Sequence, residues 1–207
     1  MIQVSQRIEN KAMYVYTIKD IAMALVRVGQ TKKAVEILGK AIQVAQSIDK
    51  EMEHVYAFKV IAVTLVRAGK PDRAIQVAQG ARYEEVIADA LAGIAVTLSE
   101  AGKFDQVDQA IQVAQGIKHR LLRVFVLEKI AVMLAKVGEF DQAIQIAQKT
   151  EIKKVNTLIR IAKTLVEMGK FNQAFQVSQK IGGIPCLQVL AFLISEMKKA
   201  GLIKSED

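Results

Sequence analysis

The sequence predicts an all-α fold in which pairs of antiparallel helices are stacked side by side. A glycine-centred phrase recurs five times in the 207 residues, with a sixth, partial copy. Alanine, leucine, glutamine, lysine and glutamate are abundant, and all of these favour helix. Two prolines and twelve glycines leave few helix breakers, and few stretches show strand character. We therefore expect about twelve helices.

The repeated phrase is clearest in three copies, which begin at Ile61, Ile130 and Ile161. The copy at Ile130 reads IAVMLAKVGEFDQAIQIAQ, and copies from Ile21 and Ile94 contain insertions. Each copy centres on one glycine: Gly29, Gly69, Gly102, Gly138, Gly169 and, in the partial copy, Gly201. The spacings between these glycines are 40, 33, 36, 31 and 32 residues. Periods of this length are typical of stacked helical units, each of which buries its apolar face against its neighbours.

Each copy predicts two helices around a tight turn. Ile130, Leu134 and Val137 share one face of the first helix, at i, i+4 and i+7. Gly138 ends that helix, because glycine readily adopts the left-handed conformation that closes a helix. Asp141 then stands in the first turn of the second helix, where a carboxylate suits the helix dipole.

The second helix has its own signals. Pro71 occupies its start in another copy, where the missing N–H costs nothing. Ala143, Ile144 and Ala147 predict its buried stripe. The first unit adds seven residues before AIQVAQ and the third adds three, close to two turns and one turn. These insertions keep the stripe in phase, so we expect them to lengthen the helix.

We expect residues 1–207 to form a single repeat domain. The predicted parts are a half-unit at 1–9, units at about 11–48, 51–80, 82–116, 118–149 and 151–181, and a terminal half-unit at 185–201. The opening IQVSQRI nearly duplicates FQVSQKI at Phe175–Ile181, which predicts a lone second helix at the start. The chain is then either a piece of a longer array or a module whose ends meet another subunit.

The phrase resembles the tetratricopeptide repeat over nearly the whole chain. The glycine is followed two residues later by an aromatic residue and three residues beyond that by an alanine. These residues are Phe104, Phe140 and Phe171, and Ala34, Ala74, Ala143 and Ala174. The first helices also carry the family's small residue, at Ala22, Ala62, Ala95, Ala131 and Ala162. The resemblance implies an α-solenoid that winds as a right-handed superhelix, with the first helices lining its concave wall. The first helices lack the family's tryptophan or tyrosine near their start.

The resemblance also implies where a partner binds. The positions on the concave wall are Tyr16, Lys19, Met23 and Arg27, then Tyr56, Lys59, Val63 and Arg67, and farther along Phe125 and Lys163. One aromatic residue, one lysine and one arginine in each of the first two units predict an apolar groove with a positive edge. Such a groove suits an extended peptide with acidic residues. Alternatively, these side chains pack against neighbouring helices with their charges solvated.

No catalytic, cofactor or metal-binding constellation is present. His54 and His119 lack neighbouring ligands at metal-site spacing, and a solvated or helix-capping role is expected for both. Cys186 is expected to be a buried thiol. Four glutamine pairs recur in the second helices, at Gln76 and Gln79, Gln112 and Gln115, Gln145 and Gln148, and Gln176 and Gln179. They predict either a solvated outer wall or a recognition strip.

We expect a non-catalytic interaction scaffold that binds a protein or peptide on its concave face. The net charge of +8 and a cluster of Lys118, Arg120 and Arg123 leave RNA binding in the manner of pentatricopeptide repeats as one alternative. A structural module that associates with itself end to end is another. One cysteine, no signal sequence and no apolar run of about 18 residues predict a soluble, cytoplasmic protein without a membrane partner.

Overall fold

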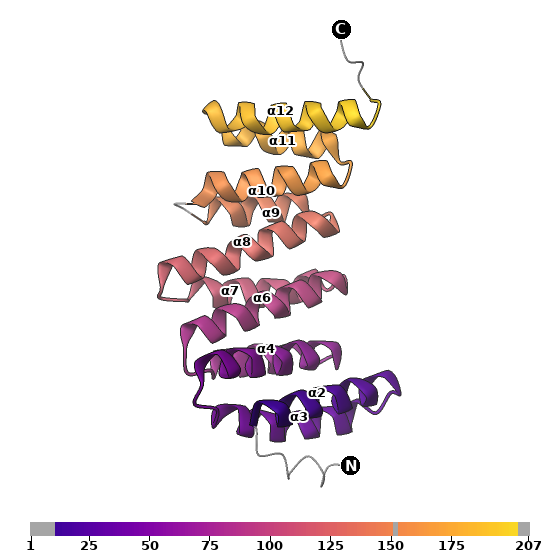
Figure 1. Cartoon of the computed structure of the whole chain (residues 1–207), viewed down its shortest axis with the longest axis vertical. Coiled ribbons are helices and arrows are strands. Elements are labelled where there is room, and N and C mark those ends of the chain that lie inside the picture. The colour runs from indigo at the N-terminus through magenta and orange to yellow at the C-terminus, as the bar shows by residue number, and fades with distance from the viewer. Residues whose placement is uncertain (1–10, 151–152, 203–207) are drawn as a thin grey trace. The chain divides into compact units, whose positions relative to one another are not determined.

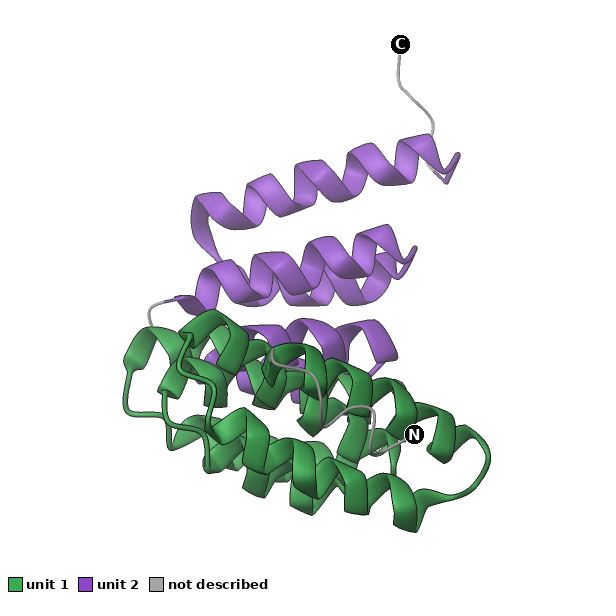
Figure 2. Cartoon of the chain, turned by 60° about the horizontal axis from the view of Figure 1, so that its bottom comes forward, with its two compact units in different colours: residues 1–126 green, residues 127–207 purple. Residues whose placement is uncertain are grey.

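The fold is all-α. The computed structural model describes residues 11–150 and 153–202, which form eleven helices and no strand. The predicted fold class is thereby confirmed, whereas the solenoid form and its right-handed superhelix stay predictions. The predicted half-unit at 1–9 lies outside the described residues. The chain divides into two compact units, unit 1 (1–126) and unit 2 (127–207), which are described separately (Figure 2). The prediction of one domain is not tested by this division.

Long first helices alternate with second helices of variable length. The first helices are α2 (Lys11–Arg27), α4 (Glu51–Arg67), α6 (Glu84–Glu100), α8 (Arg120–Val137), α10 (Lys154–Glu167) and α12 (Gly183–Lys199). The second helices are α3 (Thr31–Gln46), α5 (Pro71–Gln79), α7 (Phe104–Gln115), α9 (Phe140–Gln148) and α11 (Phe171–Ile181). With 16 residues in α3 and 12 in α7 against 9 in α5 and α9, the insertions lengthen the second helix by seven and three residues. The insertion prediction is confirmed.

The glycines end the first helices as predicted. At Gly69 the backbone φ is +71°, and the N–H of Lys70 donates to the carbonyl of Leu65 at 2.9 Å, which satisfies a carbonyl of the last turn. The other glycines of the repeat also have positive φ: Gly29, Gly102, Gly138, Gly169 and Gly201. The last helix begins two residues earlier than the expected 185. Pro185 is tolerated inside the first helical turn, where its missing N–H has no intrahelical partner to lose.

Unit 1 consists of two layers of helices. The first helices α2, α4 and α6 lie side by side, and each packs against the second helix that follows it (Figure 1). Ala22, Ala62 and Ala95 are buried where the helices meet, so small side chains allow close approach. The largest buried side chains include Phe58 and Leu91. This packing places the same register positions of α2 and α4 next to one another.

Hydrogen bonds in unit 1 join the residues before one first helix to the start of the preceding first helix. The carboxylate of Glu84, at the start of α6, accepts hydrogen bonds from the backbone N–H groups of Lys118 at 3.2 Å and His119 at 2.9 Å. His119 in turn accepts a hydrogen bond from the N–H of Leu122 on its Nδ1, at 3.4 Å. The capping role expected of His119 is therefore confirmed.

His54 was expected to be solvated or capping, and this prediction is wrong. It lies in the first turn of α4 with only 1% of its surface exposed. Its ring stacks on Phe58 at 4.5 Å and meets the edge of Tyr83 at 5.7 Å, measured between ring centroids. Burial, and secondarily the positive charge of Arg82, lowers the pKa of His54 below its ordinary value. The imidazole is buried because Tyr83 reaches it from the segment that precedes α6.

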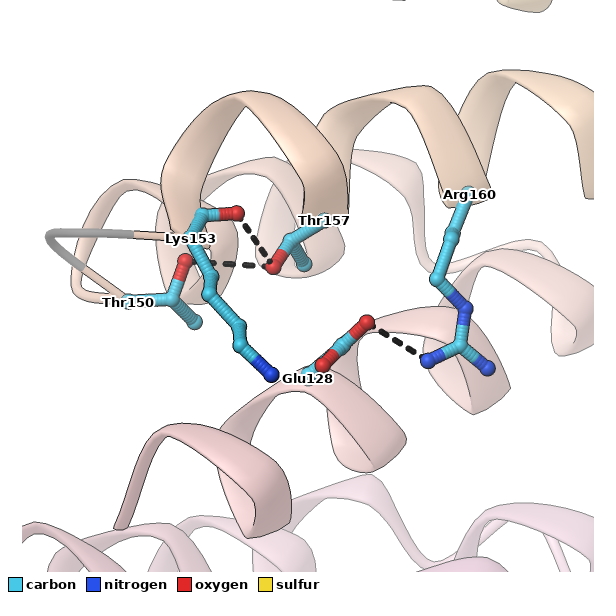
Figure 3. Close-up of polar contacts among 5 residues, drawn as sticks. All are labelled: Glu128, Thr150, Lys153, Thr157 and Arg160. Carbon is cyan, nitrogen blue, oxygen red and sulfur yellow. Dashed lines mark hydrogen bonds and ion pairs between the residues drawn. The ribbon is translucent and has the colours of Figure 1, made fainter. Parts of the chain in front are cut away.

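In unit 2, α10 and α12 lie side by side and α11 packs against both. Glu128 is buried and forms an ion pair with Arg160 of α10, at 2.5 Å between Oε1 and Nη1 (Figure 3). The hydroxyl oxygens of Thr150 and Thr157 lie 3.2 Å apart, and that of Thr157 donates to the carbonyl of Lys153 (Figure 3). These contacts connect Glu128 of α8 and the turn after α9 to α10.

The last helix keeps much of its apolar surface exposed. Only Val189 and Leu193 of α12 are buried, whereas Ile184, Leu187 and Ile194 are 73%, 64% and 47% exposed. Cys186, expected to be buried, is half-buried on this helix because one side of α12 faces no other described helix. Within residues 11–150 and 153–202, no helix has the length and apolarity needed to cross a membrane.

Candidate functional site

A cleft of about 370 Å³ lies between α2 and α4 in unit 1. The residues that line it are Lys19, Asp20, Met23, Arg27, Tyr56, Lys59, Val60, Val63, Thr64 and Arg67. Seven of these ten were predicted to lie on the wall: Lys19, Met23, Arg27, Tyr56, Lys59, Val63 and Arg67. The structure therefore brings most of the predicted residues together in one cleft.

The cleft follows from the repeat register. Lys19 and Lys59 each stand ten residues before the glycine that ends their helix (29 − 19 and 69 − 59), and Arg27 and Arg67 each stand two residues before it. Because α2 and α4 pack side by side, residues at equal distances from their glycines become neighbours. Each side of the cleft consequently carries one lysine and one arginine at equal register.

The floor of the cleft is apolar. Met23, Val60 and Val63 are half-buried there, and the hydroxyl of Thr64 donates to the carbonyl of Val60 at 2.6 Å. Gly93 of α6 lies beneath Val63, where an added Cβ would stand 3.0 Å from Val63 Cγ2. A larger residue at this position would push against the floor.

The charges of the cleft fall into two groups. Both lysines have carboxylate partners, since the Nζ atom of Lys19 lies 2.7 Å from Asp20 and that of Lys59 lies 2.8 Å from Asp89 of α6. Arg27 and Arg67 are exposed, and within the described part of the chain neither guanidinium group has an ion pair or hydrogen bond. The positive charge available to a partner is therefore concentrated on the arginine side.

The remaining predicted wall residues lie elsewhere. Tyr16 is half-buried on α2 and is not among the lining residues of the cleft. Phe125 lies on α8 in unit 1, is 40% exposed and is likewise not a lining residue. Lys163 belongs to unit 2, where its Nζ atom lies 5.8 Å from the centroid of the Phe192 ring.

Sequence reasoning missed Asp20 and Asp89 as partners of the lysines. Both could have been found. Asp20 directly follows Lys19, and Asp89 lies thirty residues after Lys59, close to one repeat period (89 − 59). Asp89 stands thirteen residues before Gly102 and Lys59 ten before Gly69 (102 − 89 and 69 − 59), so the two lie within about one helical turn of equal register.

Two other predicted features can be located. All eight glutamines of the four pairs are exposed, in agreement with the solvated-wall interpretation. In the basic cluster, the Arg123 guanidinium donates to the carbonyl of Ile117 at 2.9 Å, so part of its hydrogen-bonding capacity serves the fold. Among the described residues, no group of three or more His, Cys, Asp or Glu side chains is arranged to hold a metal ion.

In comparisons with known proteins, no protein-family model and no curated protein sequence matches this chain.

Proposed function

We propose that the chain is a non-catalytic interaction module of tetratricopeptide-like repeats, an α-solenoid with a right-handed superhelix, and that it binds a peptide of its partner between α2 and α4. The observation that carries the proposal is the cleft itself, in which equivalent residues of two successive first helices meet. Its volume of about 370 Å³ lies within the range of pockets that hold small ligands.

The chemistry of the cleft favours an extended peptide. An apolar floor formed by Met23, Val60 and Val63 accepts an apolar side chain, and Tyr56, 53% exposed, offers a rigid aromatic surface at its rim. Aromatic residues and arginines are the side chains that most often dominate binding energy in protein interfaces. The exposed Arg27 and Arg67 favour a partner with acidic groups.

The test is a selection of random peptides on the purified full chain. Selected peptides are then measured by fluorescence anisotropy against a double variant, Met23→Ala with Tyr56→Ala, which removes floor and rim without adding charge. We expect a loss of about ten-fold in affinity, because truncating central interface residues costs more than about 1 kcal/mol. Met52→Ala is the matched control, since Met52 is exposed near the start of α4 and outside the cleft. Peptides that bind the double variant and wild type equally would disprove the proposal.

A second candidate function, self-association, is favoured by the exposed apolar face of α12. Ile184, Leu187 and Ile194 form a contiguous stripe at helical spacing, and exposed apolar patches mark interaction sites. Light scattering over a concentration series should show a mass that rises with concentration for wild type and stays at the monomer value for Leu187→Glu. Gln188→Glu, an equal change of charge on the neighbouring exposed residue, should behave as wild type. A monomeric wild type at all concentrations would exclude this function.

A cytoplasmic location is part of the proposal. Cys186 is the single cysteine of this sequence, so folding requires no intrachain disulfide and no oxidising compartment. Cell fractionation with an antibody against the chain tests the location, and recovery from a secreted fraction would contradict it.

A further inference from the structure

The arginines of the cleft limit which peptides fit it. Arg27 and Arg67 occupy the same register position, two residues before the glycines that end α2 and α4. They are the cations of the cleft whose guanidinium groups stay without a protein partner in the described structure, whereas Asp20 and Asp89 neutralise the two lysines. A partner therefore meets uncompensated positive charge at two points on one edge.

The distance between those two points follows from helix packing. Helices in contact have axes about 8–10 Å apart, and residues at equal register on neighbouring helices are separated by a similar distance. α2 and α4 are in contact, and both arginines line the same cleft. Two anionic groups about 8–10 Å apart would thus each find one arginine.

An extended chain presents side chains at this spacing in one particular way. In the polyproline II conformation the rise is about 3.1 Å with three residues per turn, so residues i and i+3 point to the same side about 9 Å apart. Adjacent residues point to different sides and lie much closer together. The arginine spacing consequently matches acidic residues three apart and not acidic residues in tandem.

We propose that the groove selects an extended peptide with two carboxylate side chains three residues apart, one bound by Arg27 and one by Arg67. The intervening apolar side chain rests on Met23 and Val63. Because an arginine guanidinium offers planar paired donors, each carboxylate is bound by charge-assisted hydrogen bonds. This inference rests on the proposed function and adds the identity and spacing of the partner's charged groups.

The experiment uses three fluorescein-labelled peptides on the full chain. The first has two glutamates three residues apart with leucine and proline between them, the second places the two glutamates next to each other, and the third replaces them by glutamines. We expect the first to bind at least about five-fold more tightly than the others, with affinity that falls as salt rises, because solvent-exposed charges are screened.

Variants of the protein test whether Arg27 and Arg67 bind the two carboxylates. Arg27→Gln and Arg67→Gln should each weaken the first peptide about five-fold, and the double variant about twenty-fold, because each removes one charged contact worth about 1 kcal/mol. Lys40→Gln is the matched control, since it removes the same charge from an exposed position on α3 outside the cleft. Circular dichroism of each variant verifies that the helical fold is retained.

The outcomes separate this inference from the proposed function. One outcome contradicts only the inference. In it, the selected peptides bind the Met23→Ala and Tyr56→Ala double variant more weakly than wild type, but they contain no paired acidic residues and bind both arginine variants as tightly as wild type. The proposed peptide-binding cleft would then be supported and the inference wrong. Equal affinity for the peptides with adjacent and with spaced glutamates would disprove the proposed spacing of three residues. If the arginine substitutions weaken the binding of single-stranded RNA but not the binding of the acidic peptide, the partner is RNA and the inference is wrong. If no peptide depends on the cleft, the inference and the proposed function both fail.

Discussion

Unit 1 and unit 2 carry the same kind of ion pair with its charges reversed. In unit 1, Lys59 of α4 pairs with Asp89 of α6, and in unit 2, Glu128 of α8 pairs with Arg160 of α10. Lys59 and Glu128 both stand ten residues before the glycine that ends their helix (69 − 59 and 138 − 128). In these two cases the position carries a charge that pairs with the next first helix, whatever its sign. Lys19, at the same position of α2, pairs with Asp20 of its own helix, so the register places the charge but not its partner.

The two pairs differ in depth. The side chains of Lys59 and Asp89 are 37% and 22% exposed, whereas that of Glu128 is 9% exposed and that of its partner Arg160 is 56% exposed, so the difference lies in the burial of the carboxylate. A partly solvated pair contributes little, because water replaces a lost partner, but a buried carboxylate without its partner carries the full cost of desolvation. The pair in unit 1 consequently affects mainly the charge of the cleft, whereas in unit 2 the buried Glu128 carboxylate depends on Arg160 for its compensating charge.

The largest effect is expected from Arg160→Ala. It leaves the Glu128 carboxylate buried and unpaired, which should lower the free energy of unfolding by about 1–3 kcal/mol. Urea unfolding followed by circular dichroism measures this loss. Adding Glu128→Gln should recover part of it, since a neutral amide is less costly to bury. Lys154→Ala, an exposed residue on the same helix, is the control, and an equal loss in both single variants would refute the contrast between the units.

The next effect is a dependence of stability on pH in unit 1, which contains both histidines of the chain. The pKa of His54 is lowered from 6.5 by burial and by Arg82, so the folded state favours the neutral ring. The unfolded state then binds more protons below pH 6.5, and stability should be constant above that pH and fall as the pH drops below it. Urea midpoints measured at several pH values should show this decline for wild type and His119→Gln, and a flatter profile for His54→Leu. A His54→Leu profile parallel to wild type would assign the pH dependence to other groups.

A smaller effect is expected from Asp89→Asn. It releases Lys59 from its carboxylate and adds a free positive charge to the cleft. The affinity for a peptide with acidic residues should rise about two-fold, while stability changes by less than about 1 kcal/mol, because the pair is partly exposed. Fluorescence anisotropy measures the gain. Asp105→Asn removes an equal charge at an exposed site on α7, and a gain of the same size there would mean that net charge alone is responsible.

The smallest effects are expected at the exposed glutamines of the second helices in both units. Gln76→Ala in unit 1 and Gln145→Ala in unit 2 remove exposed side chains at corresponding positions. Both variants should match wild type in stability within about 0.5 kcal/mol and in peptide affinity, as is usual for exposed surface sites. A marked loss of peptide binding in either variant would instead support the interpretation of these glutamines as a recognition strip.

Most of the fold could be predicted because its signals are local. The glycine turns, the Pro71 helix start and the lengthening of α3 and α7 each depend on a few neighbouring residues and on helical periodicity. Seven cleft residues were expected on one wall because of the resemblance to the tetratricopeptide repeat, and they lie together because α2 and α4 pack side by side. The partners of Lys19 and Lys59 did not follow from the register, because Asp20 and Asp89 stand nine and thirteen residues before their glycines (29 − 20 and 102 − 89) and thus occupy no shared position of the repeat.

The sequence by itself determined the helices, their turns and the register in which one unit meets the next, because propensity, capping and period are properties of short segments. Only the tertiary structure decided the state of individual side chains. It buried His54 under Tyr83, bound Lys59 of the cleft to Asp89 of α6 and left the face of α12 exposed. Burial and pairing between helices depend on which residues a neighbouring helix places opposite a side chain, and the sequence of a single segment does not specify those residues.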